Sequence, residues 1–261
     1  MKRPTRALTE SEAALTEWQR DVEGFGEEGQ EKLRNSTVLI SRCGGVGGAA
    51  ALQLAAAGIG KIRLAHAGMV VASDLNRQVL LSHEDIGRRR VECSAKRLRA
   101  FNPFLEIEAI PENASQINAD RLVQGMDLVL SCAPLFAERL ALNAAAVRFA
   151  IPLIDAAMFE LELQLLVVLP GKTACLACLY PEEPPGWHRR FPVFGAVSGT
   201  VGCLAAMEAI KCLSEMGQGL AGQLLLADLR TMRFQRMALH RRRECLACGH
   251  LGREEIHDQS V

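Results

Sequence analysis

Residues 37–48 read Thr37-Val38-Leu39-Ile40-Ser41-Arg42-Cys43-Gly44-Gly45-Val46-Gly47-Gly48. The first five residues are rich in apolar and β-branched side chains, which is typical of a buried strand, and a glycine cluster follows almost at once. We expect an alanine-rich helix over residues 48–57 and a second strand over residues 61–65. A strand, glycine turn, helix and strand in this order predict a βαβ unit, and therefore a parallel sheet covered by helices.

Further helices and strands alternate along the rest of the chain. Helices are expected over residues 11–20, 27–34, 91–101, 137–149 and 195–213, and strands over residues 105–110, 127–131, 151–155, 161–169, 223–227 and 232–238. We predict a Rossmann-like α/β fold: a mostly parallel sheet with helices on both faces, extended by C-terminal mixed or antiparallel strands.

The predicted organisation is one main domain with short flanking segments. Residues 1–25 form an N-terminal arm, residues 26–250 the domain, and residues 251–261 a C-terminal tail. The Rossmann-like half spans about residues 36–155. Residues 181–192 include a proline-rich stretch that cannot form a regular element, so we expect a long loop there.

Composition narrows the class of protein. The chain of 261 residues is 49% hydrophobic and 23% charged, which is ordinary for a globular protein. Its 30 basic and 30 acidic residues give no net charge, so nothing favours a nucleic-acid partner. The N-terminus is polar, and no apolar run reaches the roughly 18 residues needed to span a bilayer. We therefore expect a cytoplasmic protein with no membrane partner.

Two cysteine pairs are the sharpest local signal. Cys175 and Cys178 form one C-x-x-C motif, and Cys245 and Cys248 form the other, after 66 intervening residues. Four thiolates suit a closed, tetrahedral structural zinc site, although a redox role is the main alternative. The other five cysteines are interpreted as small core residues rather than nucleophiles: Cys43, Cys93, Cys132, Cys203 and Cys212. In particular, burial in an apolar helix is expected to blunt the reactivity of Cys203.

The glycine cluster lies where a phosphate-binding turn would lie, between a strand and a helix N-terminus. A G-x-G-x-x-G match would place glycines at positions 42, 44 and 47, but position 42 is an arginine that is expected to project into the ligand space. The second strand ends at Ala65-His66-Ala67-Gly68, without the acid that would hold a ribose hydroxyl. A purely structural turn therefore stays open as an alternative.

Over residues 25–249 the chain resembles the ThiF/MoeB/HesA family of ubiquitin-activating-like enzymes. The resemblance rests on several separate motifs: Gly29-Gln30 with Leu33, Val38-Leu39-Ile40 leading into Gly44-Gly45-Val46-Gly47, Leu75-Asn76-Arg77-Gln78, Ile86-Gly87, Asn102-Pro103, Gly195-Ala196-Val197-Ser198-Gly199, Ala206-Met207-Glu208-Ala209-Ile210-Lys211, and both C-x-x-C pairs.

The resemblance implies a homodimer that binds MgATP in the glycine loop. Such enzymes adenylate the C-terminal glycine of a small ubiquitin-like sulfur-carrier protein and release pyrophosphate. The family's four cysteines hold structural zinc, here Cys175, Cys178, Cys245 and Cys248. The loop after the first pair crosses over the tail of the carrier.

Site residues are carried over from the family by position. Arg77 and Arg90 are the expected phosphate-contacting cations, with Arg90 in place of a lysine, and Arg20 is the arginine that reaches the neighbouring subunit's ATP. These three are the catalytic candidates. The expected nucleotide-binding set is Gly44, Gly45, Gly47, Asp74, Arg77, Gln78 and Arg90.

Several positions depart from the family pattern. His66 replaces the ribose-binding aspartate, Gly68 a second acid, and Asp74 an asparagine, while Pro134 stands where the magnesium-associated aspartate is expected. These changes predict impaired adenylation. The alternatives are a fully active adenylyltransferase with atypical residues, a non-catalytic zinc-stabilised scaffold, and a site for a different ligand with His66 and Arg42 as new contacts.

Overall fold

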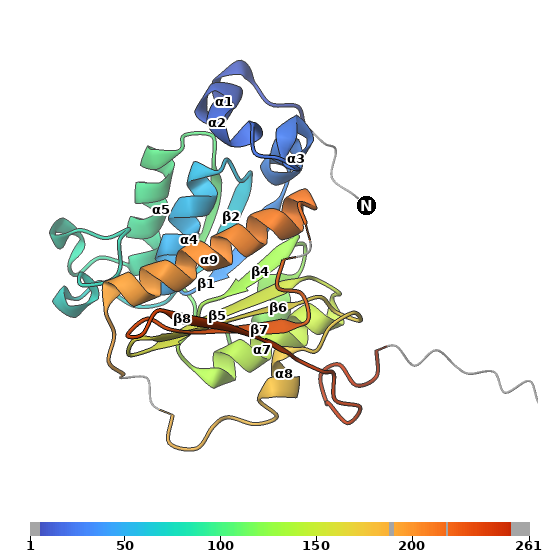
Figure 1. Ribbon diagram of the computed structural model, residues 1–261. Coiled ribbons are helices and arrows are strands. Elements are labelled where there is room, and N and C mark those ends of the chain that lie inside the picture. The colour runs from blue at the N-terminus through green and yellow to red at the C-terminus, as the bar shows by residue number, and fades with distance from the viewer. Residues whose placement is uncertain (1–5, 188–190, 218, 252–261) are drawn as a thin grey trace, which may run out of the picture.

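An eight-stranded sheet forms the centre of the computed structural model, which describes residues 6–187, 191–217 and 219–251 (Figure 1). The strand order is β3-β2-β1-β4-β5-β6-β7-β8. Five neighbouring strands are parallel: β3 (Glu106–Ile110), β2 (Lys61–Ala65), β1 (Thr37–Ser41), β4 (Leu128–Ser131) and β5 (Leu153–Phe159). The remaining strands are antiparallel: β6 (Glu162–Val168), β7 (Gln223–Asp228) and β8 (Arg233–Ala238). The predicted fold class is confirmed.

Helices cover both faces of the sheet. One face carries α4 (Gly45–Ala56), α5 (Arg90–Phe101) and α9 (Gly195–Ser214), and the other carries α6 (Ala119–Val123), α7 (Phe136–Arg148) and α8 (Leu176–Leu179). Three N-terminal helices precede the sheet: α1 (Glu10–Leu15), α2 (Glu17–Arg20) and α3 (Gly26–Arg34). Two 3₁₀ turns lie between β2 and α5: η1 (Ala72–Asp74) and η2 (His83–Asp85).

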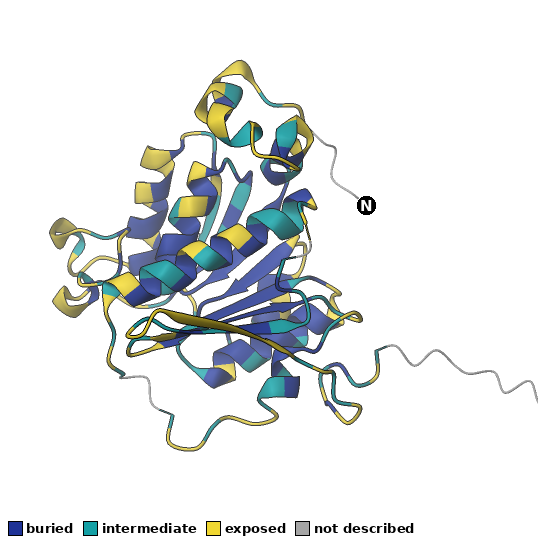
Figure 2. Cartoon of the chain, in the orientation of Figure 1, coloured by how far each residue is buried: buried dark blue, intermediate teal, exposed yellow. Residues whose placement is uncertain are grey.

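Each face of the sheet has its own hydrophobic core, because strand side chains alternate between the two faces. On β1, Val38 and Ile40 pack in the cluster that includes α4, α5 and α9, whereas Leu39 packs in the cluster that includes α6 and α7. All three are fully buried, and Figure 2 shows the central strands as the most deeply buried part of the chain. The near-continuous apolar runs in the sequence follow from this burial on both faces.

Helix α9 is the longest apolar helix among the described residues. By length and composition it could cross a membrane, but it packs along α4 and against β5, and 44% of its most apolar window is buried. These contacts give it the position of a core helix. Strand β8, in contrast, lies at the edge of the sheet, and all six of its residues are exposed to solvent.

Helix α4 begins at Gly45, three residues before the predicted start, so that boundary was wrong. Glycine has low helix propensity, but here close packing requires it, because a Cβ on Gly47 would lie 2.2 Å from the carbonyl oxygen of Arg42.

The strand order of the sheet reverses between β1 and β4. In open α/β sheets, a ligand crevice forms outside the carboxyl ends of the strands at such a switch point.

Candidate functional site

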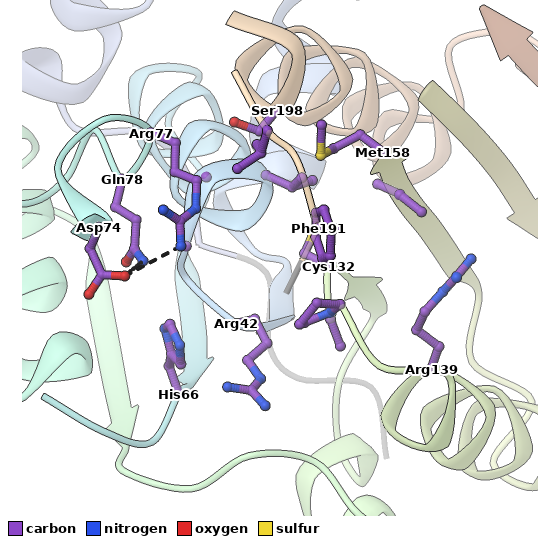
Figure 3. A pocket seen from close by; sticks show the side chains of 18 of the residues that line it. Arg42, His66, Asp74, Arg77, Gln78, Cys132, Arg139, Met158, Phe191 and Ser198 are labelled. Atoms are coloured by element: carbon purple, nitrogen blue, oxygen red, sulfur yellow. Dashed lines mark hydrogen bonds and ion pairs between the residues drawn. The ribbon is translucent and has the colours of Figure 1, made fainter. Parts of the chain in front are cut away.

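A cavity of about 130 Å³ opens at this switch point, at the N-terminal end of α4. It is lined by residues that follow β1, β2 and β4, by residues of β5, and by the segment before α9 (Figure 3). Figure 3 shows Asp74, Arg77 and Gln78 on one side and Met158 and Phe191 on the other. The cavity therefore has a charged end and an apolar end.

The glycine turn lies against one wall of the cavity. Of the three glycines that the sequence analysis assigned to a nucleotide, Gly44 and Gly45 line the cavity, and Gly47 is not among its described lining residues. Glycine is required at position 45, because a Cβ there would lie 2.6 Å from the hydroxyl oxygen of Ser198 on α9. The Ser198 hydroxyl itself donates to the Gly195 carbonyl at 3.0 Å. Packing against α9 therefore requires glycine at position 45, and the N-terminus of α4, where backbone N–H groups can bind an anion, lies at the cavity.

Arg42 adopts the left-handed conformation, with φ 66°, at the position of the missing glycine. Its side chain lines the cavity, but its guanidinium is held by Glu138 of α7 through two hydrogen bonds, one of them 2.8 Å from Nε to Oε2. Both side chains are buried. Arg42 therefore reaches the ligand space, as expected, but an internal carboxylate neutralises and holds its guanidinium.

At the charged end of the cavity, Asp74 accepts hydrogen bonds from three side chains, those of Arg77, Gln78 and Arg90. Its Oδ2 accepts from Arg90 Nε at 2.9 Å, from Arg90 Nη2 at 2.7 Å and from the Val71 amide at 3.0 Å. Its Oδ1 accepts from Gln78 Nε2 at 2.6 Å and from Arg77 Nη2 at 3.4 Å. The fold thus brings together the four charged or polar side chains that the sequence analysis assigned to a nucleotide.

His66, at the end of β2, lines the cavity where the family acid is expected. Its Nδ1 lies 3.4 Å from the Cys43 thiol. Burial raises the pKa of Cys43 to about 11, and burial also raises the pKa of Cys132 on the cavity wall. Both thiols are therefore protonated at neutral pH and are poor nucleophiles, in agreement with their interpretation as core cysteines. Cys203 is different: it is exposed on α9, so its predicted burial was wrong.

The segment after β4 lacks side-chain oxygens on the cavity wall. Cys132, Ala133 and Pro134 line it there, and the Pro134 carbonyl accepts a hydrogen bond from the Trp187 indole at 2.7 Å. Trp187 and Phe191 belong to the predicted loop of residues 181–192, of which residues 188–190 lie outside the described chain. The two rings are 5.7 Å apart and bound the apolar end of the cavity.

Sequence reasoning missed a second buried ion pair in the wall. Arg139 of α7 donates to Asp155 of β5, from Nε at 3.0 Å and from Nη2 at 2.5 Å, and the Ser131 hydroxyl donates to the same carboxylate at 2.9 Å. Arg139 also stacks 4.4 Å over the Phe136 ring. An acid at the end of the predicted strand over residues 151–155 is the signal that could have indicated Asp155, which the structure places within β5, but no local pattern links it to Arg139.

Arg20 lies away from this cavity. On α2 its Nη1 donates to Glu27 at 2.6 Å and its Nη2 to the Ala13 carbonyl at 3.2 Å. It is not among the described residues that line the cavity of its own chain. A role for Arg20 in a neighbouring subunit's site stays a prediction.

The four predicted cysteine ligands come together in the core cluster that includes α7 and α8. Their sulfurs all lie within 4.8 Å of one another, and all four residues are buried. Cys175 and Cys245 Sγ are 3.7 Å apart, and Cys178 and Cys248 Sγ are 3.5 Å apart. Zn–S bonds of about 2.3 Å place tetrahedral ligands roughly 3.8 Å apart, so these sulfurs could hold such an ion.

Comparison with known proteins agrees with this architecture. The model of the ThiF family matches residues 17–247. The heterocyst HesA protein of Trichormus variabilis is 43% identical over 242 residues, covering 93% of this chain and 91% of that protein. The sulfur carrier protein ThiS adenylyltransferase of Escherichia coli is 39% identical, covering 85% and 89%.

A solved structure has the same fold. The crystal structure of E. coli MccB with MccA-N7isoASN matches with a TM-score of 0.81 at 24% identity, covering 94% of this chain and 76% of that one. Sequence and fold thus agree, and the chain belongs to the ThiF family.

Proposed function

We propose that this chain binds ATP in the cavity and adenylates the C-terminal glycine of a small ubiquitin-like or sulfur-carrier protein, at an impaired rate. The observation that carries the proposal is the cavity itself: a glycine loop and two arginines, Arg77 and Arg90, line one space in a chain of the ThiF family. A 39% identical relative is named for adenylation of the sulfur carrier ThiS.

The proposed reaction is a nucleotidyl transfer. A carboxylate oxygen of the carrier's terminal glycine attacks the α-phosphorus of ATP. The new O–P bond gives an acyl adenylate, and the bond to the β-phosphate oxygen breaks, so that pyrophosphate leaves with the electron pair. Catalysis of such a step depends mainly on positioning and on stabilising negative charge.

The charged end of the cavity supplies groups for that stabilisation. Arg77 and Arg90 would hold phosphate oxygens, and the backbone of Gly44 and Gly45 would approach them at the N-terminus of α4. Asp74 and Gln78 would act by positioning the two guanidinium groups. In a homodimer, which we also propose, Arg20 of one subunit would serve the cavity of the other.

The apolar end suits the carrier's tail. Ala156 and Ala157 of β5 line the cavity together with Trp187 and Phe191 of the loop over residues 181–192. An extended glycine tail has no side chains that would clash with these residues. We therefore assign the tail to the space between β5 and the two aromatic rings.

The impairment follows from the replaced acids. Pro134 lacks the carboxylate that would hold a metal ion at the phosphates, and the loss of a catalytic metal can cost on the order of several kcal/mol of transition-state stabilisation. His66 likewise offers no carboxylate to a ribose hydroxyl. We propose slow adenylation rather than a different reaction, because both phosphate-contacting cations line the cavity.

The remaining assignments are part of the same proposal. We assign structural zinc to the four cysteines and a cytoplasmic location to the protein, with no nucleic-acid or membrane partner. The rival functions are a fully active adenylyltransferase, a non-catalytic scaffold that binds the carrier without turnover, and a site for a different ligand. The scaffold is favoured by one observation, namely that Asp74 is fully engaged by internal donors.

ATP–pyrophosphate exchange tests the proposal directly. Purified protein, ATP and candidate carriers should give slow exchange that requires the carrier's terminal glycine, and a carrier that lacks this glycine is the matched control. Arg77→Ala should reduce the exchange at least tenfold, since it removes a phosphate contact. Rapid exchange would refute the impairment. Binding of the carrier with no exchange at all would leave the scaffold function.

A further inference from the structure

Three carboxylates lie in or next to the described wall of the cavity, and each forms an ion pair with an arginine of the same chain: Asp74, Glu138 and Asp155. Asp74 is the only carboxylate among the described residues that line it. Its side chain is about 5% exposed, and its two oxygens accept five hydrogen bonds, from Arg90, Arg77, Gln78 and the Val71 amide. Magnesium needs oxygen ligands at about 2.0–2.1 Å in octahedral geometry. A magnesium ion at Asp74 would have to displace these donors and lie beside two guanidinium cations.

The two neighbouring acids are equally occupied. Glu138 forms a buried ion pair with Arg42, and Asp155 forms one with Arg139. Each pair is formally neutral, and removing an arginine from it would leave a buried charge uncompensated, which is strongly unfavourable. Neither carboxylate is available to a metal ion.

The position of the expected metal-binding acid is also closed. Pro134 has no side-chain oxygen, and its carbonyl already accepts from the Trp187 indole. The side chains present around the cavity therefore do not fit a magnesium ion, even though the family resemblance implies one.

The same groups give the cavity a surplus of positive charge. The Arg42–Glu138 and Arg139–Asp155 pairs carry no net charge. The remaining charged groups are Arg77, Arg90 and Asp74, whose charges sum to one positive charge beside the N-terminus of the 12-residue helix α4. The Asp74 carboxylate binds both guanidinium groups, so it keeps two like charges together at the cavity wall. A planar guanidinium is well suited to phosphate oxygens.

We infer that this cavity binds the polyphosphate of its nucleotide as a metal-free anion, with Arg77 and Arg90 in the role that a divalent cation has elsewhere. The inference rests on the proposed nucleotide function and specifies the ligand: uncomplexed ATP rather than MgATP. Magnesium in solution lowers the charge of ATP and occupies its phosphate oxygens. Magnesium should therefore compete with the protein for ATP rather than assist its binding.

Binding measurements with and without magnesium test this directly. Isothermal titration of the full-length protein should give a higher affinity for ATP in EDTA than in saturating magnesium, by up to about tenfold, and equal affinities would contradict the competition. Pyrophosphate, which has no nucleoside, should bind in EDTA as well. Arg77→Ala should weaken both interactions at least tenfold, whereas Arg88→Ala should leave them unchanged, because Arg88 is exposed outside the cavity.

Two substitutions of Pro134 test whether a carboxylate at this position creates magnesium-dependent ATP binding. Pro134→Asp adds a carboxylate where the family has one and should make ATP binding tighter with magnesium than in EDTA. Pro134→Asn has nearly the same shape without the charge and should keep the wild-type preference. Both substitutions retain the backbone carbonyl that accepts from Trp187.

The outcomes separate this inference from the proposed function. Wild-type binding of ATP only in the presence of magnesium would overturn the inference and leave the nucleotide function intact. Binding of pyrophosphate but not ATP in EDTA, weakened by Arg77→Ala, would support the cationic anion site and overturn the nucleotide function. Failure of both anions to bind under either condition would overturn both.

Discussion

Arg42 combines an unfavourable backbone with a favourable side-chain contact. A non-glycine residue in the left-handed region costs about 1–2 kcal/mol, and Arg42 has φ 66°. Its guanidinium in return neutralises Glu138 in the wall of the cavity. At this position the chain has a strained arginine in place of an unstrained glycine, and the arginine supplies the positive charge that pairs with Glu138 of α7.

We predict that Arg42→Gly destabilises the protein, although it restores the family's glycine. Relief of the backbone strain is smaller than the roughly 3–5 kcal/mol cost of leaving a buried charge unpaired. Denaturant unfolding should show a net loss of about 1–4 kcal/mol. The double variant Arg42→Gly/Glu138→Gln should recover most of this loss, because it removes the unpaired charge. Equal stability of Arg42→Gly and wild type would show that the ion pair contributes nothing.

Among the helices, the contact between α4 and α9 fixes the glycine turn in space. Gly202 lies where the two helices cross: a Cβ there would be 2.4 Å from the Val46 carbonyl oxygen and 2.8 Å from the Ala49 Cβ. Gly199, one turn earlier on α9, differs from it, because a Cβ at that position would meet no other atom within 4 Å. The two glycines therefore serve different purposes in one helix.

Gly202→Ala should destabilise the fold by about 1–3 kcal/mol, because the added methyl group overpacks the helix crossing. It should also weaken nucleotide binding, since α4 carries the glycine turn at its N-terminus. The matched control Gly199→Ala should be neutral or stabilising by up to about 1 kcal/mol through helix propensity. Thermal unfolding and ATP titration of both variants measure these effects. A harmless Gly202→Ala would mean that the helices can separate freely.

Across the molecule as a whole, the cysteine cluster joins distant parts of the chain. Cys175 and Cys178 lie at α8, and their partners follow β8, 70 positions later. Because ligands 70 positions apart form no preorganised site in the unfolded chain, metal binding at this cluster would be coupled to folding. The cluster closes the C-terminal strands onto the α7 face of the sheet.

We expect purified protein to contain about one zinc ion per chain, and chelation or Cys248→Ser to lower the melting temperature by several degrees. Cys203→Ser is the matched control, since Cys203 is exposed on α9 and outside the cluster. Metal analysis and thermal unfolding provide the measurements. A metal-to-chain ratio near zero, with Cys248→Ser as stable as Cys203→Ser, would contradict the zinc assignment.

Local sequence pattern was enough to predict the strands and the cysteine cluster, whereas the charged end of the cavity was predicted from the family resemblance. Apolar runs such as residues 37–41 and 127–131 indicated buried strands, because strands covered on both faces need apolar side chains at successive positions. The two C-x-x-C pairs indicated the cysteine cluster although 66 residues separate them, and the family motif around Arg77 and Gln78 indicated the charged end. Each strand and each cysteine pair is recognised within a few neighbouring residues.

Which charges neutralise one another became evident only in the folded chain. Arg42 meets Glu138 across 96 positions, and Arg139 meets Asp155 on another element. Pairings between distant residues depend on how helices pack on the sheet, and one chain contains too many arginines and acids for spacing to select among them. The same reason explains the exposed Cys203, which lies on the side of α9 that the sheet and α4 leave uncovered.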